Sequence, residues 1–147
     1  MALDITCGLK CLHSEEIIHR DLHSKNILVN NGKLLIADLG LSKKIEANTS
    51  SMANRMGIVE YIEPQCFNNA DYKKDKKSDI YGLGVILWEI TSGRPPFSNY
   101  QQQELLSHHI SINKLRETPI RDTPLEYQQL YQKCWDDDPN IRPDNRY

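Results

Sequence analysis

Apolar residues at the start of the chain follow the period of an amphipathic helix. Within residues 2–13, Ile5, Leu9 and Leu12 recur at the spacing that places them on one helical face. The sequence therefore opens directly inside a helix. Because a natural domain rarely begins without a lead-in, we expect the chain to be a truncated part of a longer one.

Two short apolar segments, 27–29 and 34–36, have the pattern of paired β-strands. They flank Asn31-Gly32, and Asn-Gly is the strongest short-range signal for a two-residue hairpin turn. With this turn, Asn30 faces Lys33 across the hairpin. The sequence thus predicts one small antiparallel hairpin whose register is set by the turn.

The same register brings two polar residues together at the open end of the hairpin. Asn26 lies opposite Ala37, so Asp38 is one residue past the second strand. Directly opposed residues in an antiparallel pair lie about 5 Å apart. The side chains of Asn26 and Asp38 are therefore predicted to converge and to share one metal ion, with Asp21 nearby.

Two further helices are predicted after a long polar connection. Residues 41–62 lack a clear period, and a connection of that length is usually either functional or disordered. Ser78 is expected to cap a helix running to about Thr91 that is apolar all round and hence buried. A shorter helix is expected around residues 102–110.

A last helix is predicted by the sequence Thr123-Pro124-Leu125-Glu126, which has the form of a capping box with proline at the first helical position. The apolar stripe of this helix consists of Tyr127, Leu130, Tyr131 and Cys134. The predicted fold class is therefore mainly α with a small β-hairpin.

Composition and charge exclude several classes of protein. The 147 residues are 39% hydrophobic and 26% charged, which is typical of a soluble globular domain with a core. The net charge of −2 gives no footing for nucleic acid or an anionic membrane. No apolar run approaches the roughly 20 residues of a membrane span, and no secretory pattern precedes the first helix. We therefore expect no nucleic-acid or membrane partner and a cytoplasmic or nuclear location.

The basic cluster and the cysteines of the chain indicate no binding site. The one basic cluster, residues 73–77, is expected to be an exposed loop. The four cysteines contain no CxxC pair and are spaced too irregularly for a disulfide framework or a zinc site. They are predicted to be reduced and mostly buried thiols.

Candidate chemistry is concentrated in the octapeptide His19–Asn26 and in Asp38-Leu39-Gly40, which begins twelve residues after Asn26. The octapeptide supplies a carboxylate, Asp21, that is suited to accept a proton from a substrate hydroxyl. Asn26 and Asp38 supply an amide and a second carboxylate that are suited to hold Mg²⁺ against nucleotide phosphates. These are parts of a phosphoryl-transfer site.

The motifs resemble, in order and spacing, those of the C-terminal lobe of a eukaryotic protein kinase, and the resemblance covers nearly the whole chain. The octapeptide resembles the catalytic loop, and its wording is most similar to tyrosine-kinase-like serine/threonine kinases. Asp38-Leu39-Gly40 resembles the metal-binding DFG, and Glu63-Pro64-Gln65 resembles the APE that closes the activation segment. Asp79 and Gly84 match the DxxxxG pattern of the central helix.

The resemblance implies a role for each catalytic position. Asp21 is similar to the base that orients the substrate hydroxyl, and Asn26 and Asp38 are similar to the Mg²⁺ ligands. Lys25 occupies the position where a cation meets the transferring phosphate. Leu28 resembles the residue that packs beneath adenine. The implied cofactors are ATP and Mg²⁺, and the implied partner is a protein substrate.

Other matching positions are structural. His19 and Leu39 resemble the lower part of the hydrophobic spine, and both are expected to pack in the core. Asp79 is expected to bond the backbone of the catalytic loop. Arg142 matches the late arginine that pairs with the APE glutamate.

A regulatory role is implied for Arg20, which resembles the arginine that receives a phosphorylated activation loop. Thr49, Ser50 and Ser51 are candidate phosphate acceptors in that loop. The alternative is that these hydroxyls only keep a loop soluble.

Three positions depart from the family pattern. His23 replaces the catalytic-loop lysine usual in serine/threonine kinases, and Ile58 replaces the threonine usual after Gly57. Both changes concern the surroundings of the acceptor hydroxyl, so transfer to Tyr as well as Ser/Thr stays open. Gln65 replaces the APE glutamate, so Glu63 or Glu60 is left to neutralise Arg142, as a weaker partner.

The 147 residues contain no Gly-rich loop, no phosphate-gripping lysine and no partner glutamate, which belong to the N-terminal lobe of such kinases. We therefore expect a partial kinase domain, truncated at both ends and weakly active or inactive alone. Two alternatives stay open: a pseudokinase-like binding or scaffold module, and a small-molecule kinase. Glu63-Pro64-Gln65 and the Asp79–Gly84 pattern favour a protein kinase over the small-molecule enzyme.

Overall fold

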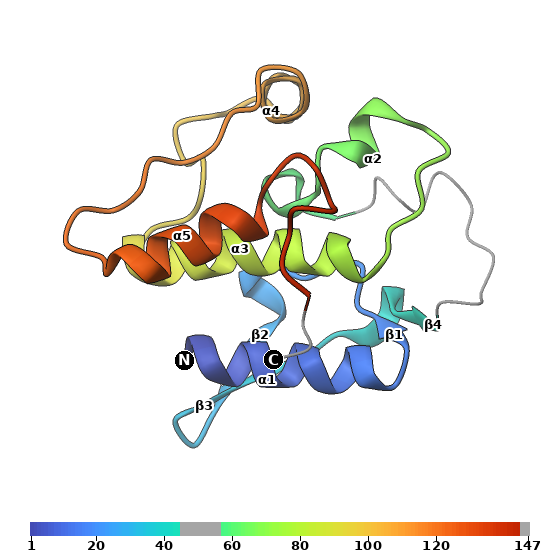
Figure 1. Cartoon of the computed structure of the whole chain (residues 1–147), viewed down its shortest axis with the longest axis vertical. Helices are drawn as coiled ribbons and strands as arrows, with labels where there is room; N and C mark the ends of the chain where they lie inside the picture. The colour runs from blue at the N-terminus through green and yellow to red at the C-terminus, as the bar shows by residue number, and fades with distance from the viewer. Residues whose placement is uncertain (45–56, 145–147) are drawn as a thin grey trace.

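The computed structural model describes residues 1–44 and 57–144. For Lys43 and Lys44 it describes the backbone only. It confirms a mainly helical chain with a small β-hairpin (Figure 1). The helices are α1 (Ala2–Ser14), α2 (Gln65–Asn68), α3 (Lys76–Ser92), α4 (Gln103–Ser111) and α5 (Leu125–Cys134). The strands are β1 (Ile17–Ile18), β2 (Ile27–Asn30), β3 (Lys33–Ile36) and β4 (Lys43–Lys44), and short 3₁₀ turns include η1 (Ser24–Asn26), η2 (Leu39–Leu41) and η4 (Val59–Tyr61).

Helix α3 is the centre of the fold, as its uniformly apolar sequence predicts. Every residue from 78 to 88 is buried, and α5 and α1 both pack against it (Figure 1). The predicted cap, Ser78, is wrong by three residues. Asp75 is the N-cap and accepts bonds from the backbone N–H groups of Lys77 and Ser78, while the Ser78 hydroxyl accepts a bond from the Asp75 N–H. Ser78 therefore completes the capping box rather than capping the helix itself.

Helix α1 lies beside the hairpin and beneath α3 (Figure 1). Its buried face is formed by Ile5, Leu9 and His13, whereas Leu12 is half-buried. The periodicity thus identified the helix and two of its three core positions.

The hairpin has the predicted register, with Asn30 paired to Lys33 and Val29 to Leu34. Asn31 and Gly32 have φ angles of 49° and 76°, so both turn residues are left-handed, as a type I′ turn requires. At the open end the Ala37 N–H donates to the Asn26 carbonyl at 2.8 Å. The backbones of Asn26 and Ala37 therefore face each other as predicted.

The long connection predicted for residues 41–62 contains some regular structure. Strand β4 pairs antiparallel with β1, and η4 lies at the end of the connection. A two-residue strand leaves no period in the sequence, because its pairing depends on a partner far along the chain. Thr49, Ser50 and Ser51 lie outside the described residues.

Two predictions about α5 are wrong. Pro124 is the N-cap, with extended backbone (φ −51°, ψ 135°), and no side chain caps the helix, so the predicted capping box is not formed. Thr123 is consequently one residue too far from the first turn. On the predicted stripe, Tyr131 and Cys134 are buried, but Leu130 is 44% exposed.

The cysteines divide into two pairs. Cys66 and Cys134 are buried, whereas Cys7 and Cys11 are exposed on α1, and all four are free thiols. The prediction of mostly buried thiols is therefore wrong for α1, where the cysteines lie off the Ile5–Leu9–His13 face. Among the described residues, no helix has the length and apolar character needed to cross a membrane.

Candidate active site

Asp79, in the first turn of α3, holds the start of the catalytic loop. Its carboxylate accepts hydrogen bonds from the backbone N–H groups of His19 and Arg20, each at 2.8 Å. The Nε2 atom of His13 lies 2.8 Å from the same carboxylate. Asp79 is 1% exposed, so the buried charge is met by three polar contacts from two segments. The resemblance implied this contact to the loop backbone; the contribution of His13 had no sequence signal.

Arg20 has a left-handed backbone, with φ of 72°, which is costly for a residue with a long side chain. The Asp79 carboxylate bonds its N–H, and the Nζ atom of Lys74 donates to its carbonyl at 2.9 Å. The N–H and the carbonyl of Arg20 are therefore both held by side chains from other segments. The result is a rigid lead into Asp21.

Asp21 and Asn26 are brought together by the turn η1. The Asn26 amide nitrogen donates to the Asp21 carbonyl at 2.9 Å and lies 3.2 Å from His23 Nε2. His23 Nε2 also lies 3.4 Å from the Asp21 carboxylate. His23, which stands where serine/threonine kinases usually carry lysine, is thus buried beside both residues and supplies a ring nitrogen in place of an ammonium.

Gly57 passes directly over Asp21. A Cβ atom at this position would lie 2.6 Å from the Asp21 carboxylate oxygen, and the glycine φ is 128°. Both facts require glycine here. The segment before η4 therefore closes one side of the space around Asp21.

The Asp38 corner is more open. Asp38 is exposed, has a left-handed φ of 60°, and accepts a bond from the Gly40 N–H at 3.2 Å. Leu39 is 50% exposed, so the expectation that it packs in the core is wrong for this chain. Lys25 and Leu28 are also exposed. The convergence of the Asn26 and Asp38 side chains stays a prediction.

The metal-ligand set is sparse among the residues that the structure describes. No group of three His, Cys, Asp or Glu side chains there is arranged to hold a metal ion. A site made from one amide and one carboxylate is typical of Mg²⁺, which keeps several ligands from water and phosphate.

Sequence comparison agrees with the geometry. The family described as protein tyrosine and serine/threonine kinase matches residues 1–147. The chain belongs to this protein kinase family. The predicted family is thereby confirmed.

The relatives of this kinase chain are much longer proteins. The chain is 37% identical over 151 residues to the serine/threonine-protein kinase VIK of Arabidopsis thaliana, covering 97% of the chain and 34% of VIK. It is 32% identical over 145 residues to the serine/threonine/tyrosine-protein kinase HT1 of the same plant, covering 98% of the chain and 36% of HT1. A probable serine/threonine-protein kinase of Dictyostelium discoideum is 35% identical over 149 residues, covering 92% of the chain and 8% of that protein. The chain thus spans about a third or less of these relatives.

Arg142 of the kinase has a buried carboxylate partner despite the change at Gln65. Its Nη1 atom lies 2.5 Å from Glu63 Oε2, and both side chains are fully buried. Glu63 also accepts bonds from the hydroxyls of Tyr72 and Ser78. Of the two partners left open by the sequence, Glu63 is the one found, and the expectation that it pairs more weakly stays a prediction. Gln65 instead donates to the Asp137 carbonyl at 3.2 Å.

The prediction that the basic cluster at residues 73–77 is an exposed loop is wrong for Lys74. The basic cluster predicted to be an exposed loop in fact supplies the N-cap and first residues of α3, and Lys74 points inward to Arg20. Burial lowers the pKa of the Lys74 ammonium, against the opposing effect of Asp21. Burial likewise lowers the pKa of Arg20, and Asp79 opposes this shift. The Lys74 ammonium is thus held at the Arg20 carbonyl, at the start of the catalytic loop.

Tyr61 joins the loop to α3. Its hydroxyl donates to Glu89 at 2.6 Å and lies 3.0 Å from the Ser24 hydroxyl, and its ring lies 5.9 Å from the His23 ring. Burial, strengthened by the bond to Glu89, raises the pKa of Tyr61. Neither Tyr61 nor His13 could be selected from sequence, because each acts through a partner many residues away.

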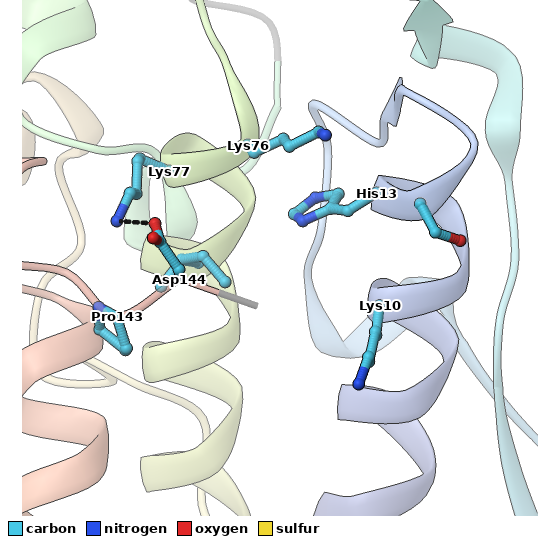
Figure 2. A pocket seen from close by; sticks show the side chains of 8 residues that line it. Lys10, His13, Lys76, Lys77, Pro143 and Asp144 are labelled. Atoms are coloured by element: carbon cyan, nitrogen blue, oxygen red, sulfur yellow. Dashed lines mark ion pairs between the residues drawn. The ribbon is translucent and has the colours of Figure 1, made fainter. Parts of the chain in front are cut away.

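A separate pocket lies behind the Asp79 contacts (Figure 2). It has a volume of about 330 Å³ between α1 and α3, and Figure 2 shows the side chains of Lys10 and His13 on one wall and Lys77 with Asp144 on the other. Lys77 and Asp144 form an ion pair of 2.7 Å. No catalytic-loop residue lines it, so it is not the candidate active site.

Proposed function

We propose that this chain supplies the catalytic-loop side of a protein kinase that transfers a phosphoryl group from ATP to Ser/Thr or Tyr hydroxyls of a protein substrate. The observation that carries the proposal is the Asp79 anchor. It fixes the backbone of His19 and Arg20 immediately before Asp21. Phosphoryl transfer depends almost entirely on positioning and electrostatics, so a rigidly held carboxylate is the essential protein part.

In this proposal Asp21 orients the acceptor hydroxyl and accepts its proton. The Asp21 side chain is partly exposed, so a substrate can reach it. Lys25, exposed on η1, offers a cation to the transferring phosphate. His23 beside Asp21 takes the place of a second cation, and this exchange is why the acceptor residue type needs a direct test.

The residues fit Mg²⁺ and ATP by their donor chemistry. The Asn26 nitrogen is used in the bond to Asp21, which leaves the amide oxygen as the atom suited to a hard cation. Asp38 offers an exposed carboxylate on the next strand end, and Leu28 an exposed apolar side chain suited to a base. When bound, Mg²⁺ neutralises charge that develops on the phosphates.

The test is a chimera in which residues 1–147 replace the matching segment of VIK. Transfer from ATP to a protein substrate, followed by identification of the phosphorylated residue type, measures both activity and acceptor preference. Asp21→Asn is expected to lower turnover by roughly 10²–10⁴-fold. The exposed Asp71→Asn is the matched control and keeps activity.

The outcomes separate the remaining alternatives. A folded chimera that binds ATP but transfers nothing would favour the pseudokinase-like scaffold. Undiminished transfer by Asp21→Asn would exclude Asp21 as the base. The purified 147-residue chain by itself is expected to show undetectable or very weak transfer, because it contains no N-lobe residues to hold the phosphates. As part of the same proposal, the protein acts in the cytoplasm or nucleus.

Regulation by phosphorylation is a second part of the proposal. Arg20 directly precedes Asp21, and an arginine there can form a bidentate pair with a phosphate on Thr49, Ser50 or Ser51. In the chimera, changing all three hydroxyl residues to alanine and changing Arg20→Ala should each remove activation by phosphorylation. Combining the changes should cost little more. Unchanged activation in the triple-alanine chimera would exclude these acceptors.

A further inference from the structure

The two exposed cysteines of α1 form a pair outside the candidate active site. Cys7 and Cys11 are four residues apart on one helix, so they lie one turn apart on the same face, with Cβ atoms about 5–6 Å apart. Both thiols are free and exposed. Neither cysteine takes part in the phosphoryl transfer proposed above.

The other two thiols have the opposite character. Cys66 and Cys134 are about 1% exposed, and burial raises the pKa of each to about 12. A thiolate is the form that binds metals and electrophiles, so these buried thiols are poor ligands at neutral pH. In the described parts of this chain, Cys7 and Cys11 are therefore the thiols that are accessible to a metal or an electrophile.

Both exposed cysteines line one groove between α1 and the hairpin. The groove has a volume of about 480 Å³, and its remaining walls are mainly apolar. They include Leu12 of α1, Leu35 of β3 and Leu39 of the Asp38-Leu39-Gly40 segment. The site can therefore accommodate a ligand that combines a thiol-binding atom with an apolar group.

The helical spacing decides which thiol chemistry fits. A disulfide requires Cβ atoms about 3.8 Å apart, closer than one helical turn provides. Structural zinc requires four ligands, and the described residues offer no group of three metal-ligating side chains. A single soft atom can bridge two sulfurs that lie one helical turn apart, and it needs only these two protein ligands.

We propose that Cys7 and Cys11 form a dithiol site that binds one trivalent organoarsenical through both sulfurs. With hydrated phenylarsine oxide, two S–As bonds form and two As–OH bonds break. The thiol protons leave with the hydroxyl groups as two water molecules. Arsenic stays trivalent, so no oxidant or reductant is needed. The phenyl group occupies the apolar groove next to Leu39, one residue from Asp38.

The experiment uses the purified 147-residue chain and phenylarsine oxide. After addition of excess 2-mercaptoethanol, intact mass is expected to show one retained arsenical per chain, and subsequent alkylation should find Cys7 and Cys11 protected. A dithiol such as 2,3-dimercaptopropanol should remove the adduct. Cys7→Ser and Cys11→Ser should each lower monothiol-resistant binding at least tenfold.

A register control keeps two exposed thiols but separates them. In Cys11→Ser combined with Ser14→Cys, the thiols at positions 7 and 14 are about 10 Å apart along the helix axis, too far for one atom to bridge. This variant should bind like the single-serine variants. The proposal is overturned if it binds like the original chain, if either single variant retains the adduct, or if the original chain does not retain it. Far-UV circular dichroism checks that α1 is intact in each case.

Discussion

The polar network around Asp79 and Arg142 and the hairpin corner around Asp38 belong to one candidate site but differ in completeness. In the network, the buried charges have partners within the chain: Asp79 contacts His13, and Arg142 contacts Glu63. In the corner, Asp38, Leu28 and Leu39 are all exposed. The proposed base side of the site is thus held by buried contacts within this chain, whereas the corner proposed for metal and nucleotide is exposed.

The difference follows from the cost of burying charge. A buried carboxylate without partners is strongly destabilising, so Asp79 and Glu63 can only exist where their donors are also fixed. An exposed carboxylate such as Asp38 has water as its partner and needs no such scaffold. Substitutions in the buried network should therefore lower stability much more than substitutions at the exposed hairpin corner.

The largest effect is expected from breaking the buried ion pair. Glu63→Gln leaves the Arg142 guanidinium without a counter-charge and should lower the free energy of unfolding by about 3–5 kcal/mol. Gln65→Ala removes one bond to a carbonyl and should cost only about 1 kcal/mol. Denaturant unfolding measures both. Equal costs would mean that the pair contributes nothing special.

The two aspartates give the direct comparison of the regions. Asp79→Ala leaves two backbone N–H groups and His13 without their acceptor and should cost about 3 kcal/mol. Asp38→Ala removes an exposed side chain and its bond from the Gly40 N–H and should cost only about 1 kcal/mol. If chemical denaturation gives similar losses for the two variants, the distinction between a closed network and an open corner is wrong.

Buried thiols should make stability depend on alkaline pH. The pKa of Cys134 is raised by burial from 9.0 to about 12, so folding favours the protonated thiol. Its stabilisation is complete below pH 9 and is lost as the pH rises from 9 towards 12. Between pH 8 and pH 10 the unfolding free energy of the original chain should fall by about 1.4 kcal/mol more than that of Cys134→Ala.

The matched control for this pH effect is Cys7→Ala, which removes an exposed thiol. Its unfolding free energy should fall between pH 8 and pH 10 as much as that of the original chain. An identical fall in Cys134→Ala would show that the buried thiol does not contribute.

The smallest effect on stability, but a clear one on solubility, is expected at the hairpin. Leu28 and Leu35 are cross-strand partners, and both are exposed. This apolar surface should bind a hydrophobic dye or promote self-association. Leu28→Lys with Leu35→Lys should reduce dye fluorescence while changing the unfolding free energy by about 0.5 kcal/mol or less. Leu125→Lys, at an exposed position of α5, is the control and should leave dye binding unchanged.

Local patterns predicted the elements well where the cause was local. The hairpin register followed from Asn31-Gly32, because both residues accept the left-handed conformation that the turn needs. The central helix followed from its uniformly apolar sequence. The cap of α3 was misplaced because Asp75 and Ser78 are both good capping residues, and only the backbone shows which of them has the extended conformation.

Contacts between distant segments could not be predicted in the same way. The choice of Glu63 over Glu60 as partner of Arg142 depends on how the segment before α2 meets the chain near residue 142. The exposure of Cys7 and Cys11 depends on which face of α1 meets α3 and the hairpin. Leu39 was expected in the core, but half of its surface is exposed.

Motif spacing and local periodicity are properties of the chain order, so they were enough to predict the family, the order of the elements and the chemical types of the candidate catalytic residues. Only folding shows which groups meet: His13 with Asp79, Lys74 with the Arg20 carbonyl, and Gly57 against Asp21. The physical reason is that a buried polar group must find its partner wherever folding places one, and sequence distance carries no information about that position.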